Sequence, residues 1–285
     1  MHGVWEANLR WAAAWAQRRD VPWVLSTHGM LHRVPMRKGW LKKRLYLTIL
    51  GSAIKGARRL LVTNTEEASF AFELVGVEST VLVNGVSLGD FSSTSVTSAP
   101  GLIPGLPSRP YLLFLGRIHE LKGIDGLIRS FAIARSSGVD TDLVLAGPPD
   151  GFEKTVTGLA RDLGVGDRVH QVGALYGQAK IDALAGCRLL VHRPRYEGFG
   201  MTIVEAMAAG RPVLTTAASG VARECPAGVL DACEDTDEGF AARIIHHCSP
   251  DHAAETESMA ERGRDWVRRE LTWDVIARRV RSIYR

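Results

Sequence analysis

The chain contains 285 residues, of which 46% are apolar, and 35 Lys and Arg against 31 Asp and Glu give a net charge of +4. The apolar fraction excludes a disordered chain, and the length suits two globular domains, because single cores stop growing at about 250 residues. No stretch approaches the ~18 apolar residues of a membrane span, and no secretory signal is expected. The four cysteines form no C-x-x-C pair, so the sequence predicts neither disulfides nor a structural zinc site and indicates a reducing cytoplasm.

Short apolar runs alternate with helix-length segments along the chain, which is typical of parallel sheets covered by helices. The predicted strands span residues 23–27, 60–63, 80–83, 111–115, 142–146, 169–172, 189–192 and 212–215. Three of them lie in a partial N-terminal domain, residues 1–91, and a Ser-, Pro- and Gly-rich linker follows at 92–109. The other five form a complete doubly wound domain, residues 110–266. A C-terminal helix is predicted within 267–285 from its helical apolar spacing.

The first predicted strand is followed by His28 and Gly29. Open parallel sheets bind ligands beyond the carboxyl ends of their strands, so this position is a candidate site. A lone histidine is more often structural, and His28 carries little weight by itself. An earlier pair, His2 and Gly3, stands near the N-terminus.

The segment from His28 to Thr65 contains nine basic residues and no acidic one, so the rest of the chain is net negative. The basic residues are Arg33, Arg37, Lys38, Lys42, Lys43, Arg44, Lys55, Arg58 and Arg59. The segment is either a solvated helix that happens to be basic or a surface that attracts an anionic ligand or membrane. The sequence leaves both interpretations open.

Two cations follow the predicted strand 111–115, where the chain reads Gly116, Arg117, and then Lys122 and Gly123 before a helix. Gly116 lets the backbone approach a ligand closely. Fixed positive charge beside a helix N-terminus suits a diphosphate and stabilises it as a leaving group. Taken alone, Arg and Lys in a loop are more often merely solvated.

The strongest motif follows the predicted strand 189–192 and reads YEGFGMTIVEAM from Tyr196 to Met207. Gly198 and Gly200 have no side chains, so the backbone is accessible to a ligand where a helix begins. Backbone N–H groups and the positive end of the helix dipole can therefore face an anion or a sugar oxygen.

Two carboxylates belong to this motif, Glu197 in the loop and Glu205 on the helix eight residues later. Each carboxylate could accept hydrogen bonds from a pair of vicinal hydroxyls. One pair would belong to a sugar and the other to a ribose. If Glu205 is buried in so apolar a helix, it needs hydrogen-bonding partners. For an isolated glutamate, a side chain that points to solvent is the favoured interpretation.

Other motifs are weaker. No G-x-G-x-x-G follows a strand and no P-loop pattern is present. The sequence therefore disfavours a nicotinamide-cofactor site and a P-loop nucleotide site. The pair Asp140 and Asp142 precedes a strand and so lies at the edge opposite the expected site. The pair Asp235 and Asp237 belongs to an acidic run that we expect on the surface. The sequence therefore predicts no divalent metal at the site.

Together these motifs resemble the retaining GT-B glycosyltransferases of glycosyltransferase family 4, also called glycosyl transferases group 1. The similar segments are STHGML at 26–31, VNGV at 83–86, FLGR at 114–117 with Lys122-Gly123, LAG at 145–147, EGFG at 197–200 and EAMAAGRPV at 205–213. The E-x7-E element in its strand-loop-helix frame is the most specific of them.

The resemblance implies two facing Rossmann-like domains of the GT-B type, with a nucleoside-diphosphate sugar bound mainly by the C-terminal one and an acceptor by the N-terminal one. By the same resemblance, Arg117 and Lys122 hold the diphosphate. Glu197 contacts the donor sugar, and Glu205 contacts the nucleotide ribose. His28 reaches the transferred sugar, so His28 and Glu197 are the expected catalytic residues.

Further expectations come from the same family. Gly116, Gly198, Phe199 and Gly200 complete the expected donor-binding set. The family retains anomeric configuration without a metal or other cofactor. The segment Arg33–Arg59 becomes a surface for lipid-linked or membrane-associated acceptors, and the C-terminal helix crosses back to the first domain.

The N-terminus departs from the family. Members begin with a strand and a glycine-rich loop before a His-Gly-x-Trp element, whereas here that element, His2–Trp5, stands at the start. The resemblance therefore implies that the N-terminal domain lacks its first strands, through either a misplaced start or a true truncation. A smaller departure is that residues 225–240 look like a compressed loop.

These observations predict a metal-independent glycosyltransferase of EC class 2.4 that takes part in polysaccharide or glycoconjugate synthesis in the cytoplasm, at the inner face of the membrane. Its partners are a nucleotide-sugar donor and a saccharide or lipid-linked acceptor, and no nucleic acid. The alternative is a non-catalytic nucleotide-sugar-binding fragment that pairs with another chain through an exposed strand edge. A sugar-nucleotide epimerase on the same scaffold fits the basic segment less well. The donor base, donor sugar and acceptor are left open.

Overall fold

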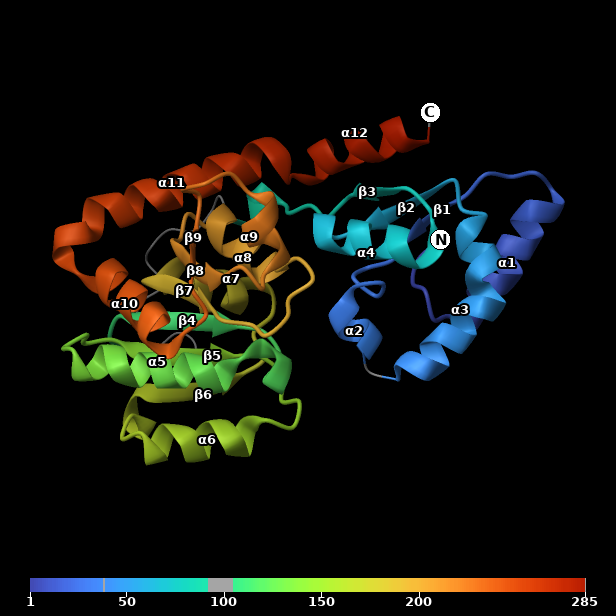
Figure 1. The fold of residues 1–285 in the computed structure, drawn as a ribbon. Helices are drawn as coiled ribbons and strands as arrows, with labels where there is room; N and C mark the ends of the chain where they lie inside the picture. The colour runs from blue at the N-terminus through green and yellow to red at the C-terminus, as the bar shows by residue number, and fades with distance from the viewer. Residues whose placement is uncertain (38, 92–104, 285) are drawn as a thin grey trace. The chain divides into compact units, whose positions relative to one another are not determined.

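The computed structural model describes residues 1–37, 39–91 and 105–284, so most of the predicted linker lies outside the described residues. The chain divides into two compact units (Figure 1). One comprises Met1–Asn84 with Ile276–Arg285, and the other comprises Gly85–Val275. Within the described ranges, every helix is too short or too polar to cross a bilayer.

The first unit is built on a parallel sheet in the order β1-β2-β3. Its strands are β1 (Val24–Ser26), β2 (Arg59–Val62) and β3 (Ser79–Val81). The N-terminal residues extend the sheet beside β1, because the backbone of Ser26 is hydrogen-bonded to both Met1 and Gly3 at 2.9 Å. The three strands predicted for this region are confirmed, with their ends shifted by one or two residues.

Helices surround this sheet. They are α1 (Ala7–Arg18), α2 (Arg33–Arg37), α3 (Trp40–Lys55), α4 (Thr65–Val75) and, from Ile276 onward, the C-terminal α12 (Trp273–Ile283). Helix α4 starts where the Asn64 side chain accepts a hydrogen bond from the Glu67 N–H, and it ends at Gly76 in the left-handed conformation. The core beneath the helices is aliphatic and includes Leu25, Leu31, Ile54, Leu60 and Val62.

The second unit contains a six-stranded, fully parallel sheet in the order β6-β5-β4-β7-β8-β9. The strands are β4 (Tyr111–Leu115), β5 (Asp142–Ala146), β6 (Val169–Gly173), β7 (Leu189–His192), β8 (Val213–Thr216) and β9 (Asp231–Cys233). The chain moves outward from β4 to β6, returns to β7 beside β4, and moves outward again to β9. The strand order therefore reverses between β4 and β7, as in doubly wound folds.

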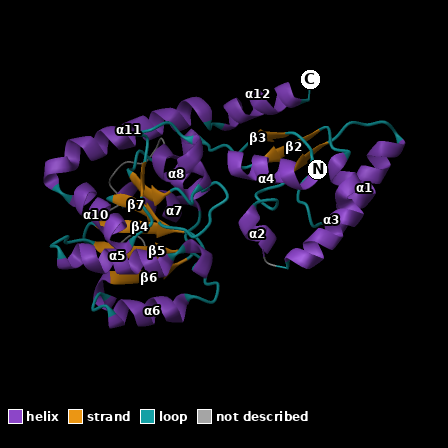
Figure 2. Cartoon of the chain, viewed as in Figure 1, coloured by secondary structure: helices purple, strands orange, loops and turns teal. Residues whose placement is uncertain are grey.

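Helices cover both sides of this sheet (Figure 2). The α-helices are α5 (Ile124–Ser136), α6 (Glu153–Asp162), α7 (Gly177–Gly186), α8 (Met201–Ala208), α9 (Gly220–Glu224), α10 (Asp237–Cys248) and α11 (Ala253–Glu270). The 3₁₀ helices are η1 (Leu88–Phe91), η2 (Glu120–Lys122), η3 (Gly166–Arg168) and η4 (Pro250–His252). Helix α5 packs beside α6 and α10, and α8 packs beside α11. The largest fully buried side chains of this core are Phe114, Phe131 and Phe240.

The number of strands in this unit corrects the sequence-based expectation of five. The sixth, β9, lies within the stretch 225–240 that looked like a compressed loop. It has three residues, begins with Asp231 and is only partly buried, so no apolar run marks it. An edge strand with one neighbour needs no such run, because it is not covered on all sides.

Candidate active site

The candidate site lies where the strand order of the second unit reverses. Two loops leave the carboxyl ends of the neighbouring strands β4 and β7, namely residues 116–123 and 193–200. Ligands of doubly wound sheets bind in the crevice at such a reversal, because the connecting helices leave the sheet on opposite sides there. The loop predicted to hold a diphosphate and the loop that carries the E-x7-E motif are thus adjacent.

Backbone contacts lock the two loops together. Gly123 has a φ of +62°, and a Cβ at this position would lie 2.0 Å from the carbonyl oxygen of Arg193. The N–H of Arg195 donates to the carbonyl of Leu121 at 3.0 Å. Only glycine satisfies both the left-handed conformation and the close approach. This turn carries the Lys122 side chain toward the β7 loop.

Glu197 is the centre of the resulting cluster. Its Oε2 forms an ion pair with Nζ of Lys122 and lies 3.2 Å from Nε2 of His192. The Lys122 and Glu197 side chains are only 17% and 18% exposed. Burial alone would raise the pKa of Glu197, but the His192 hydrogen bond and the charge of Lys122 outweigh it and lower the pKa to about 2. Glu197 is therefore an anion at neutral pH, and it cannot act as a general acid.

His192 is a site residue that the sequence did not reveal. It is the last residue of β7, is 1% exposed, and stacks on Phe114 with ring centroids 5.6 Å apart. Its Nδ1 is buried and has no hydrogen-bond partner among the described residues. Burying an imidazole with one unsatisfied nitrogen costs free energy. The hydrogen bond between its other nitrogen and Glu197 offsets part of that cost. It holds the Glu197 carboxylate in one orientation.

The Glu197 backbone is fixed from the other side by the loop that follows β8. Its N–H donates to Ala218 at 3.2 Å, and its carbonyl accepts from Gly220 at 3.1 Å. Gly200, with a φ of +104°, then turns the chain into α8. The first N–H groups of a helix have no intrahelical acceptor, so the start of α8 offers the donors that the sequence predicted at residues 198–200.

Glu205 is not directed to solvent, which was the favoured interpretation for an isolated glutamate. Its side chain is 20% exposed, and its Oε1 accepts from Nζ of Lys180 at 2.8 Å. Both residues line a cavity of about 390 Å³ with Gly177, Met201 and Trp273, within the second unit. Lys180 lies in the first turns of α7, which follows the carboxyl end of β6. A search for ligand-binding residues beyond the end of that strand would have found it. A cavity of this size accommodates a small-molecule ligand.

Arg117 does not join the Lys122 cluster. Its guanidinium donates to Oδ2 of Asp150 at 2.7 Å, and its side chain is 62% exposed. Asp150 follows β5, so this pair stands at the same edge of the sheet, one strand away. The neighbouring Gly116 continues the β4 ladder by donating to Ala146 at 2.9 Å.

The acidic run after β9 lies at the surface, as expected, and two of its carboxylates also pair with a buried cation. Asp235 and Asp237 lie 2.7 and 2.5 Å from the guanidinium of Arg193, which is only 7% exposed. Asp237 also accepts from Arg129 at 2.7 Å. The carboxylates neutralise a buried cation at the base of the β7 loop, and such a charge requires paired partners. The other predicted pair, Asp140 and Asp142, stands at the amino end of β5 as expected.

His28 belongs to the first unit. It follows β1, is exposed and has a φ of +51°, a conformation that non-glycine residues seldom adopt. Its Nε2 lies 3.0 Å from Nδ1 of His2, and the two rings are stacked. Burial and the neighbouring His2 lower the pKa of His28. Such strain is often found at functional positions.

The loop that carries His28 is held by a glutamate that the sequence did not single out. Glu67 on α4 is fully buried, and its carboxylate accepts from the Thr27 hydroxyl at 2.7 Å and from the Leu31 N–H at 3.2 Å. Its other oxygen accepts from the Thr63 N–H at 2.8 Å. One side chain thereby connects the loops after β1 and β2.

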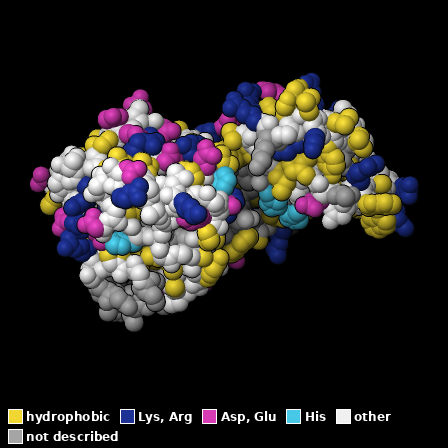
Figure 3. Space-filling model, turned by 90° about the horizontal axis from the view of Figure 1, so that it is seen from below, with side chains coloured by type: hydrophobic (Ala, Val, Ile, Leu, Met, Phe, Trp, Pro, Cys, Tyr) yellow, Lys and Arg dark blue, Asp and Glu magenta, His cyan; other side chains and the backbone are white. Residues whose placement is uncertain are grey.

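The basic segment forms an exposed surface with apolar residues. On α3, Lys42 and Arg44 are exposed, and the apolar side chains Trp40, Leu41, Leu45 and Ile49 are 51–68% exposed. Figure 3 shows hydrophobic and basic side chains, with few acidic ones, over the part of the first unit in view. The segment is thus a mixed apolar and cationic surface rather than a solely solvated basic helix.

Two family models match the chain. The model of the glycosyl transferases group 1 matches residues 104–265, and that of the glycosyl transferase 4-like domain matches residues 1–85. The D-inositol 3-phosphate glycosyltransferase of Salinispora tropica is 31% identical over 249 residues, which cover 80% of this chain and 51% of that protein. D-inositol 3-phosphate glycosyltransferase 1 of Catenulispora acidiphila is 32% identical over 254 residues, 84% of this chain and 60% of that protein. The chain spans about half the length of the curated relatives it matches.

Solved GT-B structures have the same fold. Anabaena Alr3699/HepE, in complex with UDP and glucose, is similar with a TM-score of 0.81 at 18% identity, over 97% of this chain and 75% of that one. Sucrose-phosphate synthase of Thermosynechococcus elongatus is similar with a TM-score of 0.79 at 22% identity, over 95% and 69% of the two chains. These similarities confirm the predicted α/β fold of the GT-B type.

Proposed function

The chain belongs to the glycosyl transferases group 1 family, and on that premise we propose that it transfers a sugar from a nucleoside diphosphate to a hydroxyl acceptor. The observation that carries the proposal is the cluster of Lys122, His192 and Glu197 at the reversal of strand order. It combines a cation suited to a departing diphosphate with a carboxylate that is ionised at neutral pH and suited to sugar hydroxyls.

In the proposed reaction the bond from the anomeric carbon to the donor phosphate breaks, and a bond to the acceptor oxygen forms. The acceptor proton passes to an oxygen of the departing diphosphate, and attack from the same face retains the anomeric configuration. Lys122 and the N-terminus of α8 stabilise the charge that develops on the diphosphate. Glu197 orients the sugar and offsets positive charge at its anomeric carbon.

The cavity beside Glu205 is the proposed nucleoside site. The Glu205 carboxylate, held by Lys180 at 2.8 Å, is placed to accept hydrogen bonds from ribose hydroxyls. The complexes of Anabaena Alr3699/HepE with UDP and with UDP-glucose favour uridine as the base to test first. Lys122 supplies at the diphosphate the charge that a metal supplies in other enzymes, so activity is expected to survive EDTA.

The proposed function is tested with a panel of UDP-, GDP- and ADP-sugars and with titration calorimetry of the free nucleotides. We expect UDP to bind, and the Glu205→Gln variant to bind it about tenfold more weakly, because a charged acceptor of ribose hydrogen bonds is lost. An exposed glutamate on α10, changed in Glu238→Gln, is the control. Binding of UDP without any transfer would instead support a non-catalytic nucleotide-sugar-binding protein.

We propose an anionic acceptor for this transfer. The curated relatives are named for D-inositol 3-phosphate, and a phosphorylated cyclitol suits the nine basic residues between His28 and Thr65. His28, with its strained backbone, is the proposed contact of the first unit with the transferred sugar. Myo-inositol phosphates, sugar phosphates and lipid-linked saccharides are the acceptors to compare, and the anomeric coupling constant of the product reports retention.

We also propose that the exposed α3 surface contacts an anionic bilayer. Exposed apolar residues interleaved with Lys42 and Arg44 are typical of helices that lie at a lipid interface. The Lys42→Glu/Arg44→Glu variant is expected to lower partitioning into phosphatidylglycerol vesicles at least tenfold, because each basic residue contributes about 1 kcal/mol.

Vesicle co-sedimentation measures this effect. The matched control is Lys154→Glu/Arg161→Glu, two exposed cations on α6 of the second unit. Equal partitioning of the parent and the α3 variant, or of phosphatidylglycerol and phosphatidylcholine vesicles, would contradict a membrane role.

A further inference from the structure

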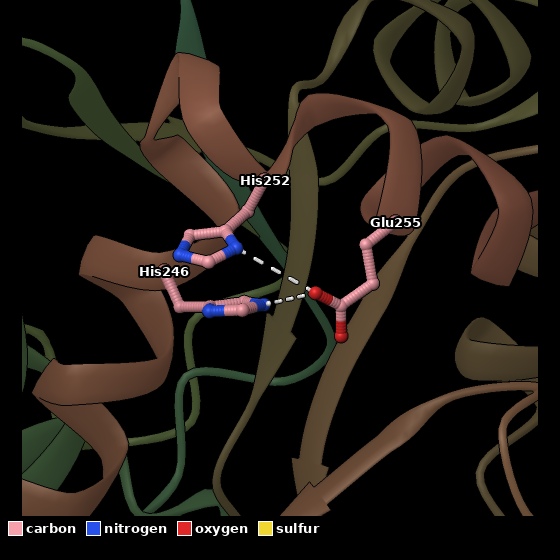
Figure 4. Close-up of side chains that lie close together, drawn as sticks. All are labelled: His246, His252 and Glu255. Carbon is pink, nitrogen blue, oxygen red and sulfur yellow. Dashed lines mark ion pairs between the residues drawn. The ribbon is translucent and has the colours of Figure 1, made fainter.

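Two histidines and a glutamate converge where α10 gives way to α11 (Figure 4). Oε2 of Glu255 lies 3.2 Å from Nε2 of His246 and 3.6 Å from Nδ1 of His252. The three donor atoms lie within 4.8 Å of one another. The sequence spacing, H-x5-H-x2-E, matches no zinc-finger pattern, so the motif search did not find the cluster.

A tight corner brings these side chains together. The Ser249 hydroxyl accepts from the Asp251 N–H at 3.2 Å, and Pro250 starts the single turn η4 that leads into α11. His246 lies in the last turn of α10, and Glu255 lies in the first turn of α11. The side chains of two consecutive helices therefore face each other across a corner of ten residues.

One donor atom of the cluster is unsatisfied. Nε2 of His246 is buried and forms no hydrogen bond among the described residues, although Glu255 is within ion-pair distance. The neighbouring polar groups are engaged elsewhere, since His247 contacts Asp231 and Thr256 at 2.8 and 3.0 Å. The imidazole nitrogen of His246 thus lies near a carboxylate without forming a well-directed hydrogen bond to it, and a cation shared by the two groups would satisfy both.

We propose that His246, His252 and Glu255 bind a divalent transition metal of the zinc class. Two imidazoles and one carboxylate suit Zn²⁺ or Co²⁺, whereas Mg²⁺ and Ca²⁺ prefer oxygen ligands alone. In a tetrahedral site with bonds of about 2.0–2.1 Å, ligand atoms lie roughly 3.3–3.4 Å apart. The distances of 3.2 and 3.6 Å to Glu255 bracket this value. Water supplies the fourth ligand.

A small rearrangement completes the site. The rings of His246 and His252 are stacked, with centroids 3.8 Å apart, so their lone pairs do not yet meet at one point. The His252 side chain is 44% exposed and can turn about its χ angles, while His246 is held at 17% exposure.

The metal site lies away from the candidate active site. A guanidinium N–H of Arg188, which immediately precedes β7, donates to the carbonyl of Cys248 at the end of α10 at 2.7 Å. The corner is thus at the amino ends of the strands, whereas Glu197 follows the carboxyl end of β7. A metal here fixes the junction of α10 and α11 and takes no part in transfer.

The test uses the full chain stripped with EDTA and titrated with Co²⁺ and then Zn²⁺. We expect one equivalent of Co²⁺ with a tetrahedral absorption spectrum, displacement by Zn²⁺, and a Zn²⁺-dependent rise in Tm. His252→Ala, a change at a partly exposed side chain, should weaken Zn²⁺ binding at least tenfold and abolish the rise in Tm.

The matched control is His170→Ala, which removes an imidazole that faces the carboxylate of Asp142 at 2.8 Å without a second histidine. It should bind Zn²⁺ as the parent does. Absence of saturable binding by the parent overturns the proposal. Equal binding by the parent and by the His246→Ala/His252→Ala variant overturns it as well, because the metal would then bind elsewhere.

Discussion

Replacement of Glu197 by glutamine is expected to lower kcat/KM for sugar transfer at least 100-fold, the usual loss when a preorganised electrostatic group is removed. The carboxylate is ionised at all working pH values, because the His192 bond and the Lys122 charge outweigh burial and lower its pKa to about 2. A neutral amide of the same shape keeps the packing but loses the charge. Steady-state kinetics with saturating acceptor separates kcat from KM, and the loss should fall mainly on kcat.

The same substitution has a signature in acid. A carboxyl group whose pKa is lowered on folding stabilises the folded state above its unfolded pKa, and this contribution disappears as pH falls through the folded value. For Glu197 the window runs from the ordinary value of 4.5 down to about 2. The contribution is roughly 3 kcal/mol, at 1.36 kcal/mol per pKa unit. Urea unfolding of Glu197→Gln should therefore depend less on pH between 4.5 and 2 than that of the parent.

The exposed carboxylate of Glu238 on α10 again serves as the control. Glu238→Gln should keep both the activity and the acid profile of the parent. If Glu197→Gln transfers sugar within threefold of the parent rate, the role proposed for Glu197 is wrong, whatever its effect on stability.

The strands of the second unit were predictable where burial is complete. All five residues of β4 are buried, because helices cover both sides of a central parallel strand, and this produces a continuous apolar run. At one edge the same reasoning fails, since β9 is a three-residue strand that reads as a polar loop, whereas the other edge strand, β6, was predicted at residues 169–172. Apolar runs therefore reveal the centre of such a sheet and can miss a short, polar edge strand.

The candidate site was predictable as a set of loops but not as a set of contacts. Lys122 and Glu197 were identified because each follows a strand, yet their ion pair depends on the close approach of Gly123 to Arg193, seventy residues apart. His192 was counted as the end of a strand, because nothing in its neighbourhood marks an inward-facing imidazole. Lys180 on α7 pairs with Glu205 on α8. The spacing of residues along either helix does not indicate a contact between the two helices.

Asp235 shows that a carboxylate at the surface can also neutralise a buried cation. An acidic run with Glu234 and Glu238 has the composition of a solvated surface. Its partner Arg193 lies 42 residues earlier and is 7% exposed. Asp235 is 56% exposed and still pairs with this buried cation, so local composition predicted its surface position but not its partner.

Replacement of Lys122 by methionine is expected to produce the other large effect, a loss of kcat/KM of about 100- to 1,000-fold, because it removes the charge proposed to stabilise the departing diphosphate. Methionine preserves the apolar stem. The affinity for UDP should fall, while that for uridine should not, since Lys122 is assigned to the phosphates and the cavity at Glu205 to the nucleoside. Calorimetry with UDP, UMP and uridine measures this difference directly.

The Lys122→Met variant also changes the state of Glu197. Without the ammonium group the burial of Glu197 is opposed by His192 alone, so its pKa should rise from about 2. Stability should then be lost at a higher pH than in the parent as the solution is acidified. Lys154→Met, at an exposed position on α6, is the control. Equal loss of UDP and uridine binding would indicate a general disturbance of the loops, whereas unchanged UDP binding would remove Lys122 from the diphosphate site. The combination of weaker diphosphate binding and a shifted acid profile is expected only if one lysine serves both the donor and the carboxylate.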